Sequence, residues 1–228
     1  NGIDRELIPS QKADFVLYGG ITRDVYLQTR PGSFIAGLQI DTPAVSAEAG
    51  TVRVSALIEG LDGLAEGARL HFVLSAPDGR PLPGGEVQIE TGAGTPPPLR
   101  LPEVETPRLW SPGDPALYRI EAALVDASGR VLHRVEEHFG FRWFEFDGNG
   151  AFLLNGKRLL LRGTHRHEEH AGLGAAMPNE LHVRDMEMMK DVGANFVRLA
   201  HYPQDPSVYD AADRLGLILW DELPWCRG

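Results

Sequence analysis

Short runs in which apolar and polar residues alternate occupy the middle of the chain and predict β-strands. This period of two, which places every second side chain on one face of a sheet, occurs at residues 51–58 (TVRVSALI), 69–74 (RLHFVL), 117–125 (LYRIEAALV) and 131–139 (VLHRVEEHF). Segments rich in glycine and proline separate the runs between residues 30 and 115. About seven short strands over about 100 residues are typical of an immunoglobulin-like β-sandwich.

A different pattern begins after residue 141, where short apolar runs alternate with longer amphipathic segments. A hairpin is predicted over residues 152–161, because Asn155-Gly156 supplies the positive φ angles of a tight turn. Buried strands are predicted at residues 196–199 and 217–220, and helices near residues 181–192 and 207–215. A glycine follows each helix, as expected at a helix C-terminus. The order strand, helix, strand, helix, strand predicts a parallel βαβαβ unit.

Residues near the start of the chain fit neither pattern. Two strands are predicted at residues 14–21 and 24–27, and two strands cannot form a core of their own. We therefore predict three regions: residues 1–30 as the last strands of a preceding domain, residues 31–142 as the sandwich, and residues 143–228 as the βαβαβ unit. A complete eight-stranded α/β barrel takes about 250 residues and does not fit beside the sandwich.

Composition and charge narrow the classes of function. Apolar residues make up 43% of the chain and charged residues 24%, which is typical of a globular protein with a core. A net charge of −10 argues against a nucleic-acid partner, because a phosphate-binding surface needs the opposite sign. No apolar stretch approaches the roughly 20 residues that span a membrane, so no membrane partner is expected. The single cysteine, Cys226, excludes an internal disulfide and leaves a cytoplasmic or a periplasmic location open.

Candidate chemistry gathers where the predicted strands of the βαβαβ unit end. Functional side chains of parallel sheets and barrels collect at the C-terminal ends of the strands. These ends are predicted at RGTHRHEEH (residues 162–170), RLAHYP (198–203) and DELPW (221–225), and five of the eight histidines lie between residues 165 and 201. Imidazole, guanidinium and carboxylate groups are therefore expected on one rim, beside the flat apolar face of Trp225.

Several of these residues allow two interpretations. His165, His167 and His170 could bind a metal ion or belong to a hydrogen-bonded loop. Arg198 could be a structural ion-pair partner or a clamp for a carboxylate or an oxyanion, and its position after a buried run favours the clamp. Glu222 could belong to the rim or cap a helix.

These motifs resemble those of glycoside hydrolase family 2, which includes β-galactosidases, β-glucuronidases and β-mannosidases. NFVRLAHYP (residues 195–203), followed by LILW (217–220), is similar to the family's first signature, with Leu199 in place of its usual small or hydroxyl residue. Other segments resemble, in chain order, the end of its jelly-roll sugar-binding domain (18–27), the close of its immunoglobulin-like domain (109–112 and 139–142) and the entrance to its barrel (155–157 and 162–168). The His-Glu loop and DELPW are most similar to the β-galactosidase group.

The resemblance implies a multidomain β plus α/β protein: the last strands of a jelly roll, an immunoglobulin-like β-sandwich and the first βαβαβ part of a TIM (β/α)8 barrel. It also implies retaining hydrolysis of a β-linked oligosaccharide or glycoside, with a general-acid glutamate and a nucleophilic glutamate about 5–5.5 Å apart. Neither glutamate is matched here and both are expected beyond Gly228. We therefore expect the chain alone to be inactive.

For the residues that are present, the resemblance implies supporting roles. Arg198 matches an arginine that orients the nucleophile, and His201 matches a histidine that contacts the sugar near the transition state. The other predicted rim residues are His165, His167, Glu222 and Trp225. A magnesium site of one branch of the family would fall on Cys226 and Gly228, so no metal or other cofactor is expected.

Two other classes of protein stay open on the sequence alone. One is a non-catalytic β-sandwich module that binds carbohydrate or protein. The other is a metal-dependent amidohydrolase-like barrel that uses His165 and His167 and needs further ligands on later strands. The open edges of a three-stranded unit also predict self-association.

Overall fold

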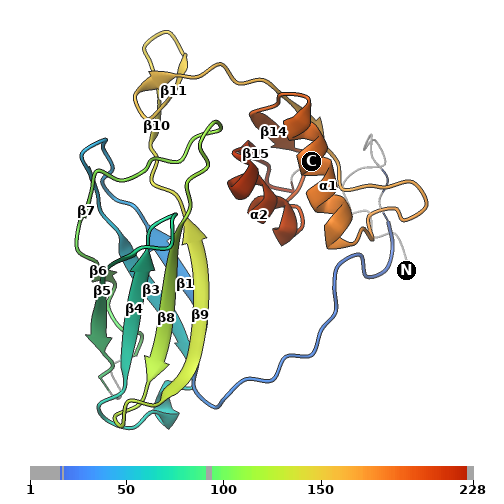
Figure 1. Ribbon diagram of the computed structural model, residues 1–228. Coiled ribbons are helices and arrows are strands. Elements are labelled where there is room, and N and C mark those ends of the chain that lie inside the picture. The colour runs from blue at the N-terminus through green and yellow to red at the C-terminus, as the bar shows by residue number, and fades with distance from the viewer. Residues whose placement is uncertain (1–15, 17, 91–93, 225–228) are drawn as a thin grey trace. The chain divides into compact units, whose positions relative to one another are not determined.

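The computed structural model describes residues 16, 18–90 and 94–224, and its contacts divide the chain into two units (Figure 1). The sandwich unit is Leu27–Leu159, and the α/β unit joins Asn1–Tyr26 to Leu160–Gly228. The start of the chain therefore groups with the region that follows the sandwich. The domain boundaries placed after residues 30 and 142 stay predictions.

The sandwich unit contains two antiparallel sheets and a short strand pair. One sheet has the order β5-β4-β8-β9, formed by Pro81–Gln88, Arg69–Ser75, Tyr118–Val125 and Val131–Phe139. The second has the order β1-β3-β6, formed by Phe34–Asp41, Arg53–Glu59 and Leu99–Arg100. The short pair is β2 (Ala49–Gly50) with β7 (Val104–Glu105), and a 3-10 turn, η1, lies at Leu61–Gly63. All four strands expected from the alternating runs are present, which confirms the sandwich.

Alternation along these strands builds the core of the sandwich. Because every second side chain of a strand points inward, Leu70, Phe72 and Leu74 of β4 are buried together. They belong to one apolar cluster with Val54 and Ala56 of β3, which lies in the other sheet. The two sheets thus share one core, in which truncation of a large side chain costs about 2–5 kcal/mol.

A three-stranded hairpin sheet follows within the same unit. It consists of β10 (Phe144–Phe146), β11 (Phe152–Leu154) and β12 (Lys157–Arg158). Asn155 and Gly156 form the turn with φ angles of 52° and 72°, the left-handed pair that a tight type I′ turn requires. The predicted hairpin is confirmed, and its second strand ends at Arg158 rather than at residue 161.

The α/β unit is built on a parallel sheet of the order β13-β14-β15, formed by Gly163–Arg166, Phe196–Leu199 and Ile218–Asp221. Helix α1 (Asn179–Asp191) connects the first two strands and α2 (Pro206–Leu215) the last two, as predicted. The glycines after them, Gly193 and Gly216, have φ angles of 90° and 70°. The helices and strands share a core that includes Met186, Val197, Leu199, Val208 and Ala211. None of the described helices is long and apolar enough to cross a bilayer.

The first strand of this sheet lies further along the chain than the sequence predicts. The apolar run at residues 159–161 is not a strand, and Leu160 is 64% exposed. Parallel pairing decides the position of β13, since Gly163 is the register partner of Phe196. Only a glycine allows this approach, because a Cβ at residue 163 would lie 1.7 Å from the Phe196 carbonyl oxygen. Strand β13 therefore lies within the polar segment, residues 162–170, that was expected to follow it.

The predicted strand pair at residues 14–21 and 24–27 is wrong for the described residues. Residues 16 and 18–30 contain no strand, and residues 14, 15 and 17 lie outside the described part of the chain. A strand exists only where a neighbouring backbone completes its ladder of hydrogen bonds. This segment is held by side-chain bonds instead, chiefly those of Arg23.

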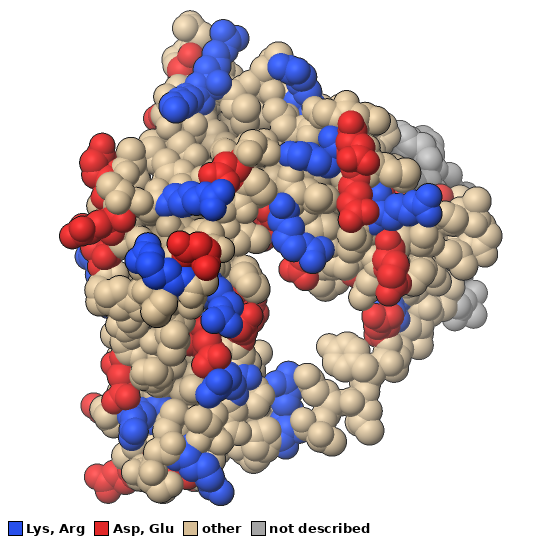
Figure 2. All heavy atoms as spheres, viewed as in Figure 1, with Lys and Arg blue, Asp and Glu red and all other residues tan. Residues whose placement is uncertain are grey.

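Charged side chains of both signs are interspersed on the surface shown in Figure 2. Some of them pair across neighbouring strands, as Arg53 does with Asp41 at 2.9 Å and Arg119 with Glu136 at 2.8 Å. Exposed pairs of this kind contribute about 0–1 kcal/mol each. The apolar cores therefore supply most of the stability of both units.

Candidate active site

Neighbouring residues of the parallel strands point to opposite faces of the sheet, which divides the polar residues into two groups. His165, Arg198 and Trp220 are register partners on β13, β14 and β15, and Arg166 and Leu199 are partners one position later. Leu199 belongs to the core formed with the two helices. We call its side of the sheet the helix face, and we call the side that carries His165, Arg198 and Trp220 the open face.

Three charged or titratable side chains meet on the open face, at the C-terminal ends of β14 and β15. Arg198 Nε donates to Glu222 Oε1, and His201 Nδ1 lies 2.8 Å from Glu222 Oε2. These hydrogen bonds, from Arg198 first and then His201, hold the pKa of the Glu222 carboxyl below its ordinary value. Glu222 is therefore an ionised carboxylate, suited to orienting the other two groups rather than to donating a proton. The Arg198 side chain is still 43% exposed.

Two further histidines lie beside this group. The ring centroid of His167 is 5.1 Å from that of His201 and 6.1 Å from that of His165. With a proton on Nδ1, His201 donates to Glu222 Oε2. The open face thus offers imidazole and guanidinium groups that can bind hydroxyl or carboxylate oxygens of a ligand.

The helix face carries a buried arginine with a complete set of partners. Arg166 is 4% exposed. Its Nη2 donates to Asp185 Oδ2 at 2.8 Å and lies 2.9 Å from His182 Nδ1, and its Nη1 donates to Gln204 Oε1. Burial first, and the Arg166 charge second, lower the pKa of His182, so this imidazole is neutral and accepts from the guanidinium. This face holds the end of β13 against α1 and the segment after β14.

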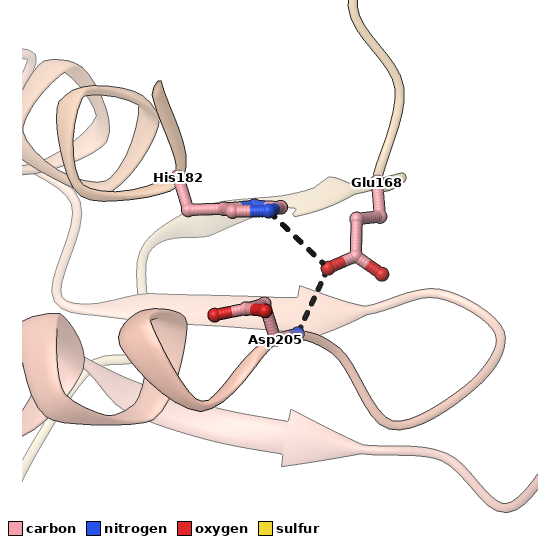
Figure 3. A group of neighbouring side chains, drawn as sticks. All are labelled: Glu168, His182 and Asp205. Atoms are coloured by element: carbon pink, nitrogen blue, oxygen red, sulfur yellow. Dashed lines mark hydrogen bonds and ion pairs between the residues drawn. The ribbon is translucent and has the colours of Figure 1, made fainter. Parts of the chain in front are cut away.

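One group of residues on the helix face has the composition of a metal site. Glu168, His182 and Asp205 present ligand atoms within 4.8 Å of one another, and all three are buried (Figure 3). Their ligand atoms already have protein partners, however. Glu168 accepts from Arg23 and from the Asp205 backbone N–H, both at 2.8 Å, and Asp205 Oδ1 accepts from the backbone N–H and the hydroxyl of Ser207.

Two guanidinium charges, those of Arg23 and Arg166, adjoin this group and would repel a cation. The donors therefore fit a hydrogen-bonded network better than a metal centre. Asp205 has a structural task of its own, as the N-cap of α2. Burial raises the pKa of the Asp205 carboxyl, but the two bonds from Ser207 outweigh it, and the net shift is downward.

The structure brings five of the six predicted rim residues to one region. These are His165, His167, Arg198, His201 and Glu222, and Trp225 lies outside the described residues. Trp220 is a further residue of the open face, 61% exposed, that sequence reasoning missed. Alternation would have found it once the strand bounds were known. Arg166 and Glu168, by contrast, lie in the predicted rim segment but belong to the helix face.

Comparison with known proteins identifies the family. The model described as "Glycosyl hydrolases family 2" matches residues 33–142, and the model described as "Glycosyl hydrolases family 2, TIM barrel domain" matches residues 147–226. The chain belongs to glycoside hydrolase family 2. The resemblance inferred from the motifs is thereby confirmed, and so is the fold class of a sandwich followed by the start of a TIM barrel. Membership of this family excludes the amidohydrolase-like alternative.

Relatives in this family carry more than one activity in their names. A Formosa agariphila protein, provisionally named as a β-glucuronidase, is 49% identical over all of this chain and 27% of its own length. An Enterobacter cloacae β-galactosidase is 36% identical over 89% of this chain and 20% of its own length. The solved apo structure of Bacteroides uniformis β-glucuronidase 3 superposes with a TM-score of 0.87 at 39% identity, over 99% of this chain and 27% of that one. The chain thus spans about a fifth to a quarter of the length of these relatives.

Proposed function

We propose that the chain is part of a longer retaining glycosidase that hydrolyses β-linked sugars, and that its open face forms part of the sugar-binding rim. The observation that carries this proposal is the Arg198–Glu222–His201 group, held together at the C-terminal ends of two parallel strands. Strand ends of this kind are where barrel enzymes place their functional side chains. Family membership and the names of the relatives support the same reaction class.

The chemistry assigns a supporting role to each of these residues. Retaining hydrolysis needs a protonated general acid and an ionised nucleophile about 5–5.5 Å apart. Glu222 is engaged by Arg198 and His201, and its lowered pKa removes it from the role of acid. We assign it to fixing the Arg198 guanidinium, which then orients the nucleophile, while His201 hydrogen-bonds the sugar. His165, His167 and Trp225 are assigned to the surrounding rim.

Two sugars are candidates for the substrate. The RGTHRHE and DELPW motifs favour a β-galactoside. The provisional name of the Formosa relative and the name of the Bacteroides uniformis structure favour a β-glucuronide. Because the general acid and the nucleophile have no match in this sequence, we propose that the 228-residue chain has no hydrolytic activity by itself.

Chromogenic substrates test both parts of this proposal. The full-length protein that contains this chain, and the chain alone, would each be incubated with 4-nitrophenyl β-galactoside, β-glucuronide and β-mannoside, with the matching α-glycosides as controls. We expect the full-length protein to cleave one β-glycoside with retention of anomeric configuration, followed by NMR, and the chain alone to release no nitrophenol.

Inversion of configuration would overturn the retaining mechanism. Nitrophenol release by the chain alone would overturn the claim that the missing carboxylates are essential. A full-length protein that binds a β-glycoside but cleaves none of the three would instead favour a carbohydrate-binding module.

A further inference from the structure

The segment at residues 18–26, which we call the arm, belongs to the same unit as the parallel sheet. Its main anchor is Arg23, whose guanidinium donates to three acceptors. Nη2 donates to Glu168 Oε2 at 2.8 Å and to the Pro203 carbonyl at 3.0 Å, and Nη1 donates to the Gln204 carbonyl at 3.1 Å. One side chain, about 145 residues from its partner in sequence, thus bridges the segments that follow β13 and β14.

A second contact fixes the arm at its other end. Tyr18 hydroxyl lies 3.4 Å from Glu169 Oε2 and can donate to it. Its ring packs against Gly174, where a Cβ would lie only 2.7 Å from the ring. The arm is therefore docked at two points on the segment after β13, of which Arg23 is the one that also reaches the segment after β14.

The Arg23–Glu168 pair is more than a surface ion pair. The Glu168 side chain is 6% exposed, and a carboxylate so buried needs a positive partner. Its second oxygen accepts from the Asp205 backbone N–H at 2.8 Å, and its own backbone N–H donates to the Tyr202 hydroxyl at 3.2 Å. Arg23 and Glu168 together therefore hold residues 202–205 in place by hydrogen bonds to both backbone and side-chain atoms.

Residues 202–205, which these hydrogen bonds hold, directly follow His201 in the chain. We call residues 201–205 the His201 loop. At its first residue, His201 Nδ1 lies 2.8 Å from Glu222 on the open face, and two positions later the Pro203 carbonyl accepts from Arg23. A shift of the Pro203 and Gln204 carbonyls would move the imidazole relative to Glu222, because only one residue separates His201 from Pro203 in the chain.

We propose that Arg23 is a positioning residue for the glycosidase reaction: it holds the His201 loop from the helix face, so that His201 stays aligned with Glu222 on the open face. The inference rests on the proposed function. Among the described residues, the hydrogen bonds of Arg23 go to Glu168, Pro203 and Gln204 rather than to the rim residues, so its effect on the reaction is transmitted through the loop. Misplacement of a group near the reacting atoms by about 1 Å can cost about a hundredfold in rate.

The test compares Arg23→Ala with the wild type in the full-length protein, on the β-glycoside that the wild type hydrolyses best. A covalent inhibitor that traps the nucleophile counts the active sites, so that kcat is obtained per competent site. We expect kcat to fall about tenfold or more with a much smaller change in KM, because His201 is assigned to contacts near the transition state. Added guanidinium ion, below denaturing concentration, should restore part of kcat.

Two further variants complete the design. Arg184→Ala removes an exposed arginine of α1 for which the described structure gives no hydrogen bond or ion pair, and it should keep the wild-type kcat. Arg23→Lys keeps the charge beside Glu168 but cannot serve three acceptors, so its kcat should fall between those of Arg23→Ala and the wild type. It also serves as the test if Arg23→Ala fails to fold.

The outcomes separate this inference from the proposed function. Wild-type kcat per active site in Arg23→Ala, with only the number of active sites reduced, would overturn the positioning role and leave the glycosidase proposal intact. If Arg23→Ala does not fold, a wild-type kcat in Arg23→Lys would likewise overturn the positioning role and leave the glycosidase proposal intact. An inactive wild-type protein would overturn the proposed function, and the positioning role with it.

Discussion

The two faces of the short parallel sheet both carry arginine, histidine and glutamate, but in different environments. On the helix face, Arg166 and Glu168 are buried and form hydrogen bonds with other protein groups, so their charges are balanced within the fold. On the open face, Arg198 is also paired with a carboxylate, that of Glu222, yet its side chain remains 43% exposed and lies 3.3 Å from His201 Nδ1. Residue type alone therefore does not distinguish an arginine that is buried within the fold from one that is exposed to a ligand.

The position in the strand makes the distinction. His165 and Arg166 are neighbours in sequence, but the pleat of β13 sends them to opposite faces. A buried charge without its partner is costly, whereas an exposed pair contributes little to stability and is free to serve a ligand. We therefore expect substitutions on the helix face to act on stability and those on the open face to act on activity.

The largest effect is expected from the buried arginine. Arg166→Met leaves Asp185, His182 and Gln204 without their donor, and we expect a loss of about 3–5 kcal/mol in the free energy of unfolding. Arg198→Met, the same change on the open face, should cost less than about 1 kcal/mol. Urea denaturation followed by circular dichroism compares the two variants. Equal losses would remove the distinction between the faces.

A smaller effect is expected from the cap of α2. Asp205 Oδ1 accepts from the backbone N–H of Ser207 at 2.9 Å, and Asp205→Ala should destabilise the α/β unit by about 1 kcal/mol. Asp205→Asn keeps a capping oxygen and should lose less in the same denaturation assay. If both variants lost the same amount, the carboxylate would be acting through its charge rather than as a cap.

The effect of pH on the stability of the fold should be smaller than the effect of the α2 cap. Its sign follows from the pKa of Glu222. The pKa of Glu222 is lowered in the folded state, so its bonds stabilise the fold at pH values above the unfolded pKa and are lost as the pH falls through the folded pKa. The wild type should therefore be more stable than Glu222→Gln at neutral pH, and the difference should shrink below about pH 4.5, the ordinary value. Thermal unfolding across this range measures it. A difference that grew at lower pH would have the wrong sign.

The smallest effect concerns association of the chain. Among the described residues, β13 and β15 each pair only with β14, and Trp220 on β15 is 61% exposed. Unpaired edges with apolar side chains favour weak self-association. Sedimentation velocity of the 228-residue chain should show a larger average mass at higher concentration, and Trp220→Lys should reduce that growth. A single monomeric species at every concentration would contradict the expectation.

Much of the fold could be predicted because its signals are local. The period of two predicted the strands of the sandwich, and Gly193, Gly216 and the Asn155-Gly156 turn marked element ends within one or two residues. Two predictions failed, the strand pair at residues 14–21 and 24–27 and the place of β13, a strand whose position depends on pairing with β14 about thirty residues later. Strand β13 is polar and follows an apolar run at residues 159–161, so nothing in its own residues indicates where the strand begins.

The candidate site on the open face was predicted in part, because local signals give the order of the strands and helices. Strand ends located Arg198, His201 and Glu222, which need only the order of the elements. The division of the RGTHRHE segment between two faces needed the bounds of β13, and the role of Arg23 needed a contact with Glu168 across most of the chain. No pattern within a single sequence reports contacts of that kind.

The most direct test of the division between the faces is the kcat/KM of Arg198→Met in the full-length protein, assayed well below its unfolding temperature with active sites counted. We predict a fall of about a hundredfold, because a fixed cation aimed at the reacting charges is lost while the fold is kept. Arg184→Ala, measured beside it, should keep the wild-type value. An Arg198→Met enzyme with wild-type kcat/KM would contradict the assignment of the open face to the reaction.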